Sequence, residues 1–448
     1  MSDEKFLNVY DNLKWTDDTL ANEGYLAVVG SIFSSALAKL LQEGYDPNYA
    51  SITISVPSSM DDDELDLTTN RVSGALTGIS AGIGIDKQYY ESTAAAFFII
   101  KDPKGGIKIG DSFNVGVDIG GGSIDLFSFQ SIIGGKKIPI PACIDSVKNA
   151  AGRKILSETF VKAAKHYYAK KTDPNPNSNP FFTCFMAESA PPSSLNSASD
   201  NAAICITETF IPDAKFDDHA LGNAKRILNT FRKNVLFKTI AVLNYAAAFV
   251  KASWKEDEKG NETDFSDAEV NIILCGNGSS VFSEEWSGIG KTEKARITEF
   301  LKRRIGCKSL TIQPSGLPKK ETVTGMKYIA ESEKAKVAKK DEDLDYDSFV
   351  QVSIPASLNG RSENVAKNYV DTLLNEIISS KLLIVKGDVD TLNGFHALLK
   401  REIDLSAVRA ALDYVLDFDE ITNKGDEMFL ADVFLRIALD LPFIDPYN

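Results

Sequence analysis

The chain has 448 residues, of which 43% are hydrophobic and 25% charged, and its formal net charge is −14. This composition is that of a globular protein with room for about two to four domains or subdomains. Because an acidic surface repels nucleic-acid phosphates, we expect no general binding to DNA or RNA.

The cysteines and the apolar segments bear on metal content and location. Five cysteines and three histidines are scattered along the chain without a CxxC pair, so the clustered ligands of a structural zinc site are missing. The low cysteine density and the polar first residues, which do not form a signal peptide, indicate a cytoplasmic protein. The apolar stretches look too short and too interrupted to span a membrane.

Helical and extended patterns alternate over the first hundred residues. Apolar residues at helical spacing predict helices over 19–43, 62–82 and 92–100. The run SITISVP at 51–57 predicts a short strand that ends at a proline, and residues 88–91 form a brief segment before the third helix.

The middle of the chain begins with two β-runs, 114–119 and 123–129, that flank a glycine turn. A helix is predicted over 142–170, and a long helix, broken at most once, over 218–254. Between them, residues 171–200 are rich in Pro, Asn and Ser, which predicts a loop or insertion.

The last part begins with a buried-type strand at 270–274, after an acidic polar loop at 255–268, and continues with a helix at 294–305. The dense mixed charges of 331–346 predict a linker or a solvated helix. Further helices are predicted at 364–380, 405–416 and 426–440. Short apolar strands that alternate with helices indicate an α/β protein, and the chain shows no internal sequence repeat.

The strongest chemical signal is the segment DIGGGSID, which runs from Asp118 to Asp125. Three consecutive glycines let backbone N–H groups approach an anion without a Cβ in the way, and Ser123 adds a hydroxyl donor. The two aspartates would repel a phosphate unless a divalent cation lies between them, and Mg²⁺ accepts such oxygen ligands. The alternative interpretation is a β-hairpin with a glycine turn and no ligand.

Three further segments are weaker signals on their own. LCGNGSS at 274–280 is either a turn against which a flat ring packs or an ordinary strand-to-helix connection. ESTAAAF at 91–97 is a helix of small residues, typical of a close helix crossing, which occurs both at hinges and in tightly packed cores. ETVTGM at 321–326 predicts a helix with a close contact at Gly325.

Together these segments resemble, in order and approximate spacing, the motifs of the actin-like ATPase superfamily, which includes DnaK-type chaperones, bacterial plasmid-segregation actins and the division protein FtsA. DIGGGSID is similar to the second phosphate motif, LCGNGSS to the adenosine motif, and ESTAAAF and ETVTGM to the two hinge motifs. The run ITISVP resembles the strand and proline upstream of the first hinge. The resemblance covers residues from about 20 to 330.

The resemblance implies a site for ATP or ADP with Mg²⁺. Asp118 and Asp125 would act on magnesium or the attacking water, and Glu91 would help to position or activate that water, which makes Glu91 and Asp118 the catalytic candidates. AKRIL at 224–228 looks like the chaperone helix that covers adenine, although Gly222 stands where the chaperones carry an acid. The implied nucleotide contacts are Gly120, Gly121, Gly122 and Ser123 for the phosphates, Gly276, Gly278 and Ser279 for the adenosine, and Lys225 and Arg226 for the base or ribose.

The chain departs from the family pattern before Ile52, where the first phosphate motif, an Asp-x-Gly-Thr-type hairpin, has no counterpart. Either the chain is a fragment, or a separate chain supplies the hairpin, or the site has degenerated. Since donors on both sides of the phosphate supply much of the catalysis, we expect weak or absent ATP hydrolysis by this chain alone. ATPase activity is expected only where the full-length protein or a partner supplies the hairpin.

The expected fold is therefore α/β: an actin-like ATPase (ribonuclease H-like) fold with a truncated first half and an α-rich C-terminal extension. The expected units are a partial first actin-like domain at 1–112, a second at 113–335 with an inserted subdomain at about 171–255, and the extension at 336–448.

The expected function is an ATP-binding actin-like or chaperone-like module that closes its cleft around nucleotide and has a protein partner or self-associates. Hinges are expected near Ala94–Ala96 and Gly325. The main alternative is a non-catalytic interaction or structural protein that retains the fold. A sugar or acetate kinase of the same superfamily would need a catalytic acid and a substrate pocket that the sequence does not reveal.

Overall fold

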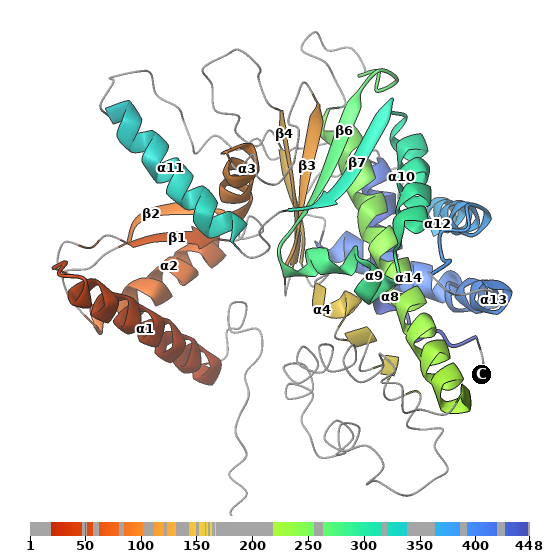
Figure 1. Cartoon of the computed structure of the whole chain (residues 1–448), viewed down its shortest axis with the longest axis horizontal. Helices are drawn as coiled ribbons and strands as arrows, with labels where there is room; N and C mark the ends of the chain where they lie inside the picture. The colour runs from red at the N-terminus through yellow and green to blue at the C-terminus, as the bar shows by residue number, and fades with distance from the viewer. Residues whose placement is uncertain are drawn as a thin grey trace, which may run out of the picture.

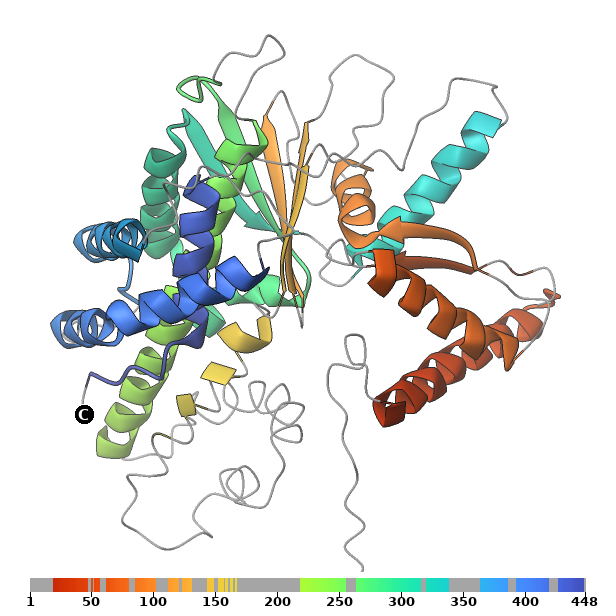
Figure 2. The ribbon, with the colours of Figure 1, turned by 180° about the vertical axis from the view of Figure 1, so that it is seen from behind.

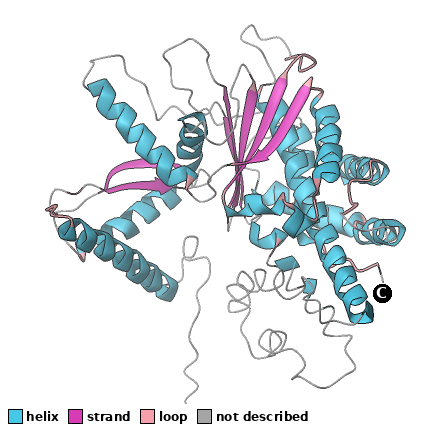
Figure 3. Ribbon diagram, in the orientation of Figure 1, coloured by secondary structure: helices cyan, strands magenta, loops and turns pink. Residues whose placement is uncertain are grey.

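A computed structural model gives the arrangement of the chain (Figure 1). It describes residues 19–46, 50, 52–56, 62–79, 85–101, 112–120, 123–130, 143–148, 152–156, 158–159, 162–163, 166, 218–254, 263–315, 320–337, 363–385, 392–418 and 426–446. These residues form a mixed α/β protein with one five-stranded and one two-stranded sheet (Figure 3).

The larger sheet has the strand order β5-β4-β3-β6-β7. β4 pairs antiparallel with both β3 and β5, whereas β3, β6 and β7 run parallel to one another. A tight turn joins β3 to β4, while the parallel pairs need crossover connections that contain helices. The strands are β3 (Phe113–Ile119), β4 (Ser123–Gln130), β5 (Cys143–Lys148), β6 (Glu269–Cys275) and β7 (Ser309–Pro314).

One face of the larger sheet is covered by α8 (Asp218–Ser253) and α10 (Lys291–Ile305). Alternate strand residues such as Val117, Leu126 and Ile272 are fully buried in this layer. Four C-terminal helices pack around α8 and contribute to the same core, so they are continuous with the sheet's packing (Figure 2). They are α12 (Glu363–Ser379), α13 (Leu392–Glu402), α14 (Leu405–Phe418) and α15 (Asp426–Asp440).

The composition of α8 is explained by its position. Its segment Asn229–Ser253 is long and apolar enough to cross a membrane, so the expectation that every apolar stretch is too short was wrong for this helix. However, 89% of its most apolar window is buried inside the protein. A helix that is apolar on all sides is typical of one surrounded by its own protein.

The other face of the larger sheet meets α3 (Glu91–Lys101), which buries Ala95 and Phe98 against Phe127 of β4. A second helix, α11 (Glu321–Val337), crosses α3 and contacts the smaller sheet. At the crossing, a Cβ added to Gly325 would lie 1.7 Å from the carbonyl oxygen of Ala94. The backbones therefore touch, which confirms the close contact predicted at Gly325.

The smaller sheet consists of β1 (Ile52–Val56) and β2 (Ile85–Tyr90), which pair in parallel. α2 (Asp62–Thr77) connects the two strands, and α1 (Thr19–Gln42) packs against α2. Three residues of this core are buried, namely Leu37, Val72 and Leu76. This lobe, defined as α1, β1, α2 and β2, is thus thinly packed beside the larger one.

The same succession of elements occurs in both parts of the molecule. A helix, a strand, a helical connection, a parallel strand and a further helix follow one another as α1-β1-α2-β2-α3 and again as α8-β6-α10-β7-α11. In the second series, two short helical segments, η4 (Asn277–Val281) and α9 (Glu284–Ser287), precede α10. The last helices of the two series are the pair that cross at Gly325.

The helix predicted over 142–170 is wrong at its start, because residues 143–148 form β5 and α4 (Gly152–Ile155) follows. β5 pairs with β4 along its whole length and thereby satisfies backbone groups that β4 would otherwise leave unpaired. The apolar residues in this segment fit both periodicities, and only the neighbouring strand distinguishes them.

Other boundaries also differ from the patterns. α2 ends at Thr77, earlier than predicted. α11 extends to Val337, so the first part of 331–346, for which a linker or a solvated helix was predicted, is helical. The strand β7 and the helix α13 are not predicted by the sequence patterns. The predicted loop at 171–200 lies outside the described residues.

Candidate functional site

The predicted phosphate turn lies between β3 and β4. Asp118 and Asp125 are directly opposite each other across this antiparallel pair, so their side chains project from the same face of the sheet. This is also the face that meets α3, because Phe127 lies two residues along β4 from Asp125. Asp125 is 4% exposed. Carboxylates are ligands of the kind that Mg²⁺ takes in proteins.

The turn itself uses some of the predicted phosphate donors. The backbone N–H of Gly120 donates to the carbonyl oxygen of Ser123 at 3.0 Å, and the Ser123 hydroxyl donates to Oδ2 of Asp125 at 2.9 Å. Both groups therefore stabilise the hairpin in this conformation. Gly121 and Gly122, whose N–H groups were predicted to bind phosphate, lie outside the described residues.

The predicted adenosine turn packs directly on the end of β3. Gly276 has a φ of 69°, and a Cβ there would lie 2.1 Å from Oδ1 of Asp118. A Cβ on Gly278 would lie 2.3 Å from Cγ2 of Ile119. Glycine is therefore required at both positions by the approach of β3, in addition to the backbone conformation at Gly276.

Ser279 completes this turn. Its side chain is 3% exposed, and its backbone N–H donates to the Gly276 carbonyl oxygen at 3.2 Å. Two segments that lie about 150 positions apart in the sequence thus form one corner at the carboxyl ends of β3 and β6. In open parallel sheets, ligands bind beyond the carboxyl ends of the strands.

The sequence patterns missed an acid near this corner. Burial raises the pKa of the Cys275 thiol well above its ordinary value, and the charges of Asp118 and Glu321 raise it further. Glu321 begins α11, is 3% exposed and accepts a hydrogen bond from the Ser315 hydroxyl. The only local signal for Glu321 was that it lies in the first turn of a helix. That signal is weak, because acids at this position commonly stabilise the helix N-terminus without belonging to a site.

The acids at this corner fit magnesium better than a metal held by protein ligands alone. Among the described residues, no group of three or more His, Cys, Asp or Glu side chains is arranged to hold a metal ion. Mg²⁺ typically takes one or two carboxylates and completes its octahedron with water and phosphate oxygens. Asp118 and Asp125 could supply such a partial set.

The structure defines the positions of the remaining predicted site residues less fully. Glu91 is the first residue of α3 and therefore lies on the same side of the larger sheet as Asp118 and Asp125. Lys225 and Arg226 fall in the N-terminal part of α8, but their side chains lie outside the described residues. The predicted base contacts of α8 thus stay predictions.

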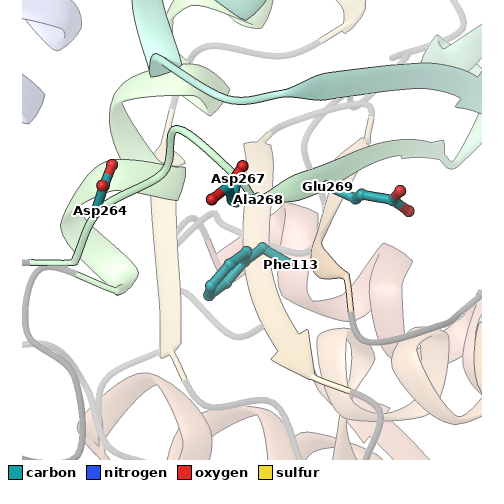
Figure 4. A pocket seen from close by; sticks show the side chains of 5 residues that line it. All are labelled: Phe113, Asp264, Asp267, Ala268 and Glu269. Atoms are coloured by element: carbon teal, nitrogen blue, oxygen red, sulfur yellow. The ribbon is translucent and has the colours of Figure 1, made fainter.

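A separate hollow of about 530 Å³ lies at the opposite edge of the same sheet (Figure 4). Phe113 and Glu269, the first residues of β3 and β6, form part of its lining. Asp264 at its rim accepts a hydrogen bond from the Ser266 N–H at 2.8 Å, which lowers the pKa of the Asp264 carboxyl. Because it adjoins the amino ends of the parallel strands, this hollow is separate from the Asp118 corner.

Comparison with known proteins leaves the corner at Asp118 as the main guide to function. No protein-family model matches the chain, and no curated protein sequence matches it.

Proposed function

We propose that this chain is an actin-like module that binds ATP or ADP with Mg²⁺ at the corner formed by the β3–β4 turn and the turn after β6. The proposal rests mainly on one observation: the predicted phosphate and adenosine segments, far apart in sequence, pack together with Asp118 in contact distance of Gly276. The larger sheet, with a hairpin followed by two parallel strands, is consistent with the α/β fold that the proposal requires.

In this proposal, Asp118 and Asp125 hold the magnesium ion, which neutralises charge between the carboxylates and the phosphates. The backbone of the glycine turn faces the phosphates, with Ser123 held in place by its bond to Asp125. Gly276 and Gly278 let the turn after β6 lie directly against the end of β3, which brings the proposed adenosine turn next to Asp118.

Nucleotide-dependent closure would use the crossing of α3 and α11. The two helices meet backbone to backbone at Ala94 and Gly325, so no side chains interlock at that point. α3 contacts both sheets and α11 contacts β1, so the crossing lies where the two lobes meet. A small rotation at the crossing would move the lobes relative to each other. Glu91, at the start of α3, would then approach or leave the phosphate turn.

Hydrolysis by this chain alone is expected to be weak or absent. The described part of the smaller lobe contains two parallel strands and no hairpin that could face the β3–β4 turn. The same observation favours a second candidate function, a non-catalytic interaction protein that retains the fold. The two functions differ in whether the corner at Asp118 binds nucleotide.

Thermal unfolding with and without millimolar magnesium–ATP tests the proposal. A ligand present at a hundred times its Kd stabilises the folded protein by about 2.7 kcal/mol, so the midpoint is expected to rise by several degrees. Asp118→Ala is expected to abolish the increase. Asp267→Ala, which removes an exposed acid at the opposite edge of the sheet, should leave it unchanged.

Isothermal titration with magnesium–ADP should give the same ranking of the three proteins. If the wild type is not stabilised by magnesium–ATP, or if Asp118→Ala is stabilised equally, the nucleotide proposal is wrong and the interaction protein is the better description.

A further inference from the structure

Among the described residues, the smaller sheet has two strands and is therefore open along both outer edges, one on β1 and one on β2. In the part of the chain that the structure describes, β1 pairs with β2 and with no strand on its other side. An unpaired strand edge presents a row of backbone N–H and C=O groups, and a two-stranded sheet is marginally stable by itself. The backbone of β1 is therefore ready to accept another strand.

The larger lobe shows how an equivalent edge is filled. β6 occupies the place in its series that β1 occupies in the first, since each precedes a helical connection and a second parallel strand. The edge of β6 away from β7 is paired with β3, which runs parallel to it and belongs to a hairpin with β4. By this internal counterpart, the strand missing beside β1 runs parallel to β1.

Apolar surface gathers in the same lobe. α1 and the turn after it carry large apolar side chains that are more than half exposed: Val28, Ile32 and Leu41 on the helix, and Tyr45 in the turn. Further apolar side chains packed against Leu37, Val72 and Leu76 are only partly buried, including Ile52 and Ile54 of β1 itself. An added strand would bury its own apolar side chains against this unfinished core, as well as pairing with the backbone.

Charge selects among the polypeptides that could supply this strand. Residues 19–101, which make up the smaller lobe and α3, contain ten acidic and four basic residues. A second copy of the chain brings the same acidic lobe, and residues 1–18 contain five acidic and two basic residues. The strand β3 of a second copy is already paired on both edges. A basic strand from a different polypeptide avoids all three obstacles.

We propose that the free edge of β1 binds a basic β-strand of another polypeptide, which adds parallel to β1 as β3 adds to β6. Backbone hydrogen bonds supply much of the affinity, and apolar side chains at alternate positions pack toward α1 and α2. Lysine or arginine residues between them complement the net acidic charge of residues 19–101. This inference does not rest on nucleotide binding, so the two can fail separately.

The test uses synthetic ten-residue peptides with valine at every second position and lysine, threonine or glutamate between the valines. Hydrogen exchange of the full chain is measured with each peptide. The lysine peptide is expected to slow exchange in β1 (52–56) by about tenfold or more, and the glutamate peptide to have no effect. The outer strand β7 of the larger sheet serves as an internal control and should not respond.

Two variants locate the contact. Successive N–H groups in a strand point to opposite edges, so one of Thr53→Pro and Ile54→Pro removes an outward donor without removing one that faces β2. The variant that keeps normal exchange in β2 is expected to bind the lysine peptide at least about tenfold more weakly. If both prolines disrupt the pairing of β1 with β2, the three peptides with the wild type decide the question.

Four results would overturn the proposal. These are equal protection by the lysine and glutamate peptides, protection of β7 as strong as that of β1, no protection of β1 by millimolar lysine peptide, and unchanged peptide binding in both proline variants. Concentration-dependent dimers with protected β1 would instead identify a second copy as the occupant. Slow exchange of β1 without peptide that becomes fast after deletion of residues 1–18 would identify the chain's own N-terminal segment.

Discussion

The two lobes contain the same succession of helices and strands but differ in how far each sheet is completed. In the larger lobe, β6 has strands on both edges and helices on both faces, and residues such as Ile272 and Ile273 are fully buried. In the smaller lobe, β1 has one strand neighbour among the described residues, and Ile52 and Ile54 are only partly buried. Completing a sheet, more than the intrinsic propensity of its strands, determines how much apolar surface is removed from water.

The largest difference is expected for deletions in the two cores. Leu126→Ala empties a site between β4 and the α8 layer and is expected to reduce the free energy of unfolding by about 3–5 kcal/mol. Leu76→Ala removes the same atoms from the smaller lobe, where thin packing allows collapse, and is expected to cost about 2 kcal/mol. Urea unfolding gives both values.

Hydrogen exchange then shows which strands each substitution destabilises. Leu76→Ala should accelerate exchange in β1 and β2 and leave β3 and β6 unchanged, since local openings expose only part of a protein. Equal costs, or equal acceleration in both sheets, would mean that the lobes unfold as one unit despite their different packing.

The next largest loss of stability is expected at the crossing of α3 and α11, where the lobes meet. Gly325→Ala places a methyl group where the Ala94 carbonyl lies, so α3 and α11 must separate, and we expect a loss of about 2–4 kcal/mol. Gly74→Ala is the matched control: Gly74 also lies within a helix, α2, but a Cβ there meets nothing within 4 Å. That substitution should stabilise the protein by about 0.5–1 kcal/mol. Effects of the same sign would contradict the tight crossing.

The last effect depends on pH and belongs to the larger lobe. Lys238 on α8 is 3% exposed, and its Nζ donates to the Lys154 carbonyl oxygen and to Oγ1 of Thr159, both at 2.8 Å. Burial lowers the pKa of Lys238 to about 7, with a further lowering from the nearby charge of Lys162. In the unfolded chain, a lysine keeps a pKa of about 10.4.

Between about pH 7 and pH 10 the unfolded state therefore binds one proton more at Lys238 than the folded state does, and this group makes stability rise with pH. The unfolding free energies of the wild type and of Lys238→Met should diverge in favour of the wild type by about 1.4 kcal/mol per pH unit. Urea unfolding at several pH values measures this difference. A difference that stays constant with pH would show that Lys238 remains charged in the folded protein.

Much of the candidate site could be predicted from local sequence. The glycines of the β3–β4 turn, the β6 run before Gly276, and the small residues of α3 at its contact with α11 each leave a signal in a few adjacent residues. β5 and β7 were not predicted, because each is held in the sheet by pairing with a neighbouring strand, which its own local sequence does not reveal. Glu321 was missed as a neighbour of the site for the same reason: its closeness to Cys275 depends on where α11 is placed.

By itself, the sequence determined the α/β class, because hydrophobic periodicity acts within one segment. The need for glycine at Gly276, Gly278 and Gly325 comes from the approach of β3 and α3, which the tertiary structure decides. Only the tertiary structure decided that Asp118 touches the turn at Gly276, since this contact joins segments that lie about 160 residues apart in the sequence. The tertiary structure also decided that the same succession of elements is closed by β3 in one lobe and left open beside β1 in the other. Pairing of this kind joins distant parts of a chain and leaves no local pattern to be read.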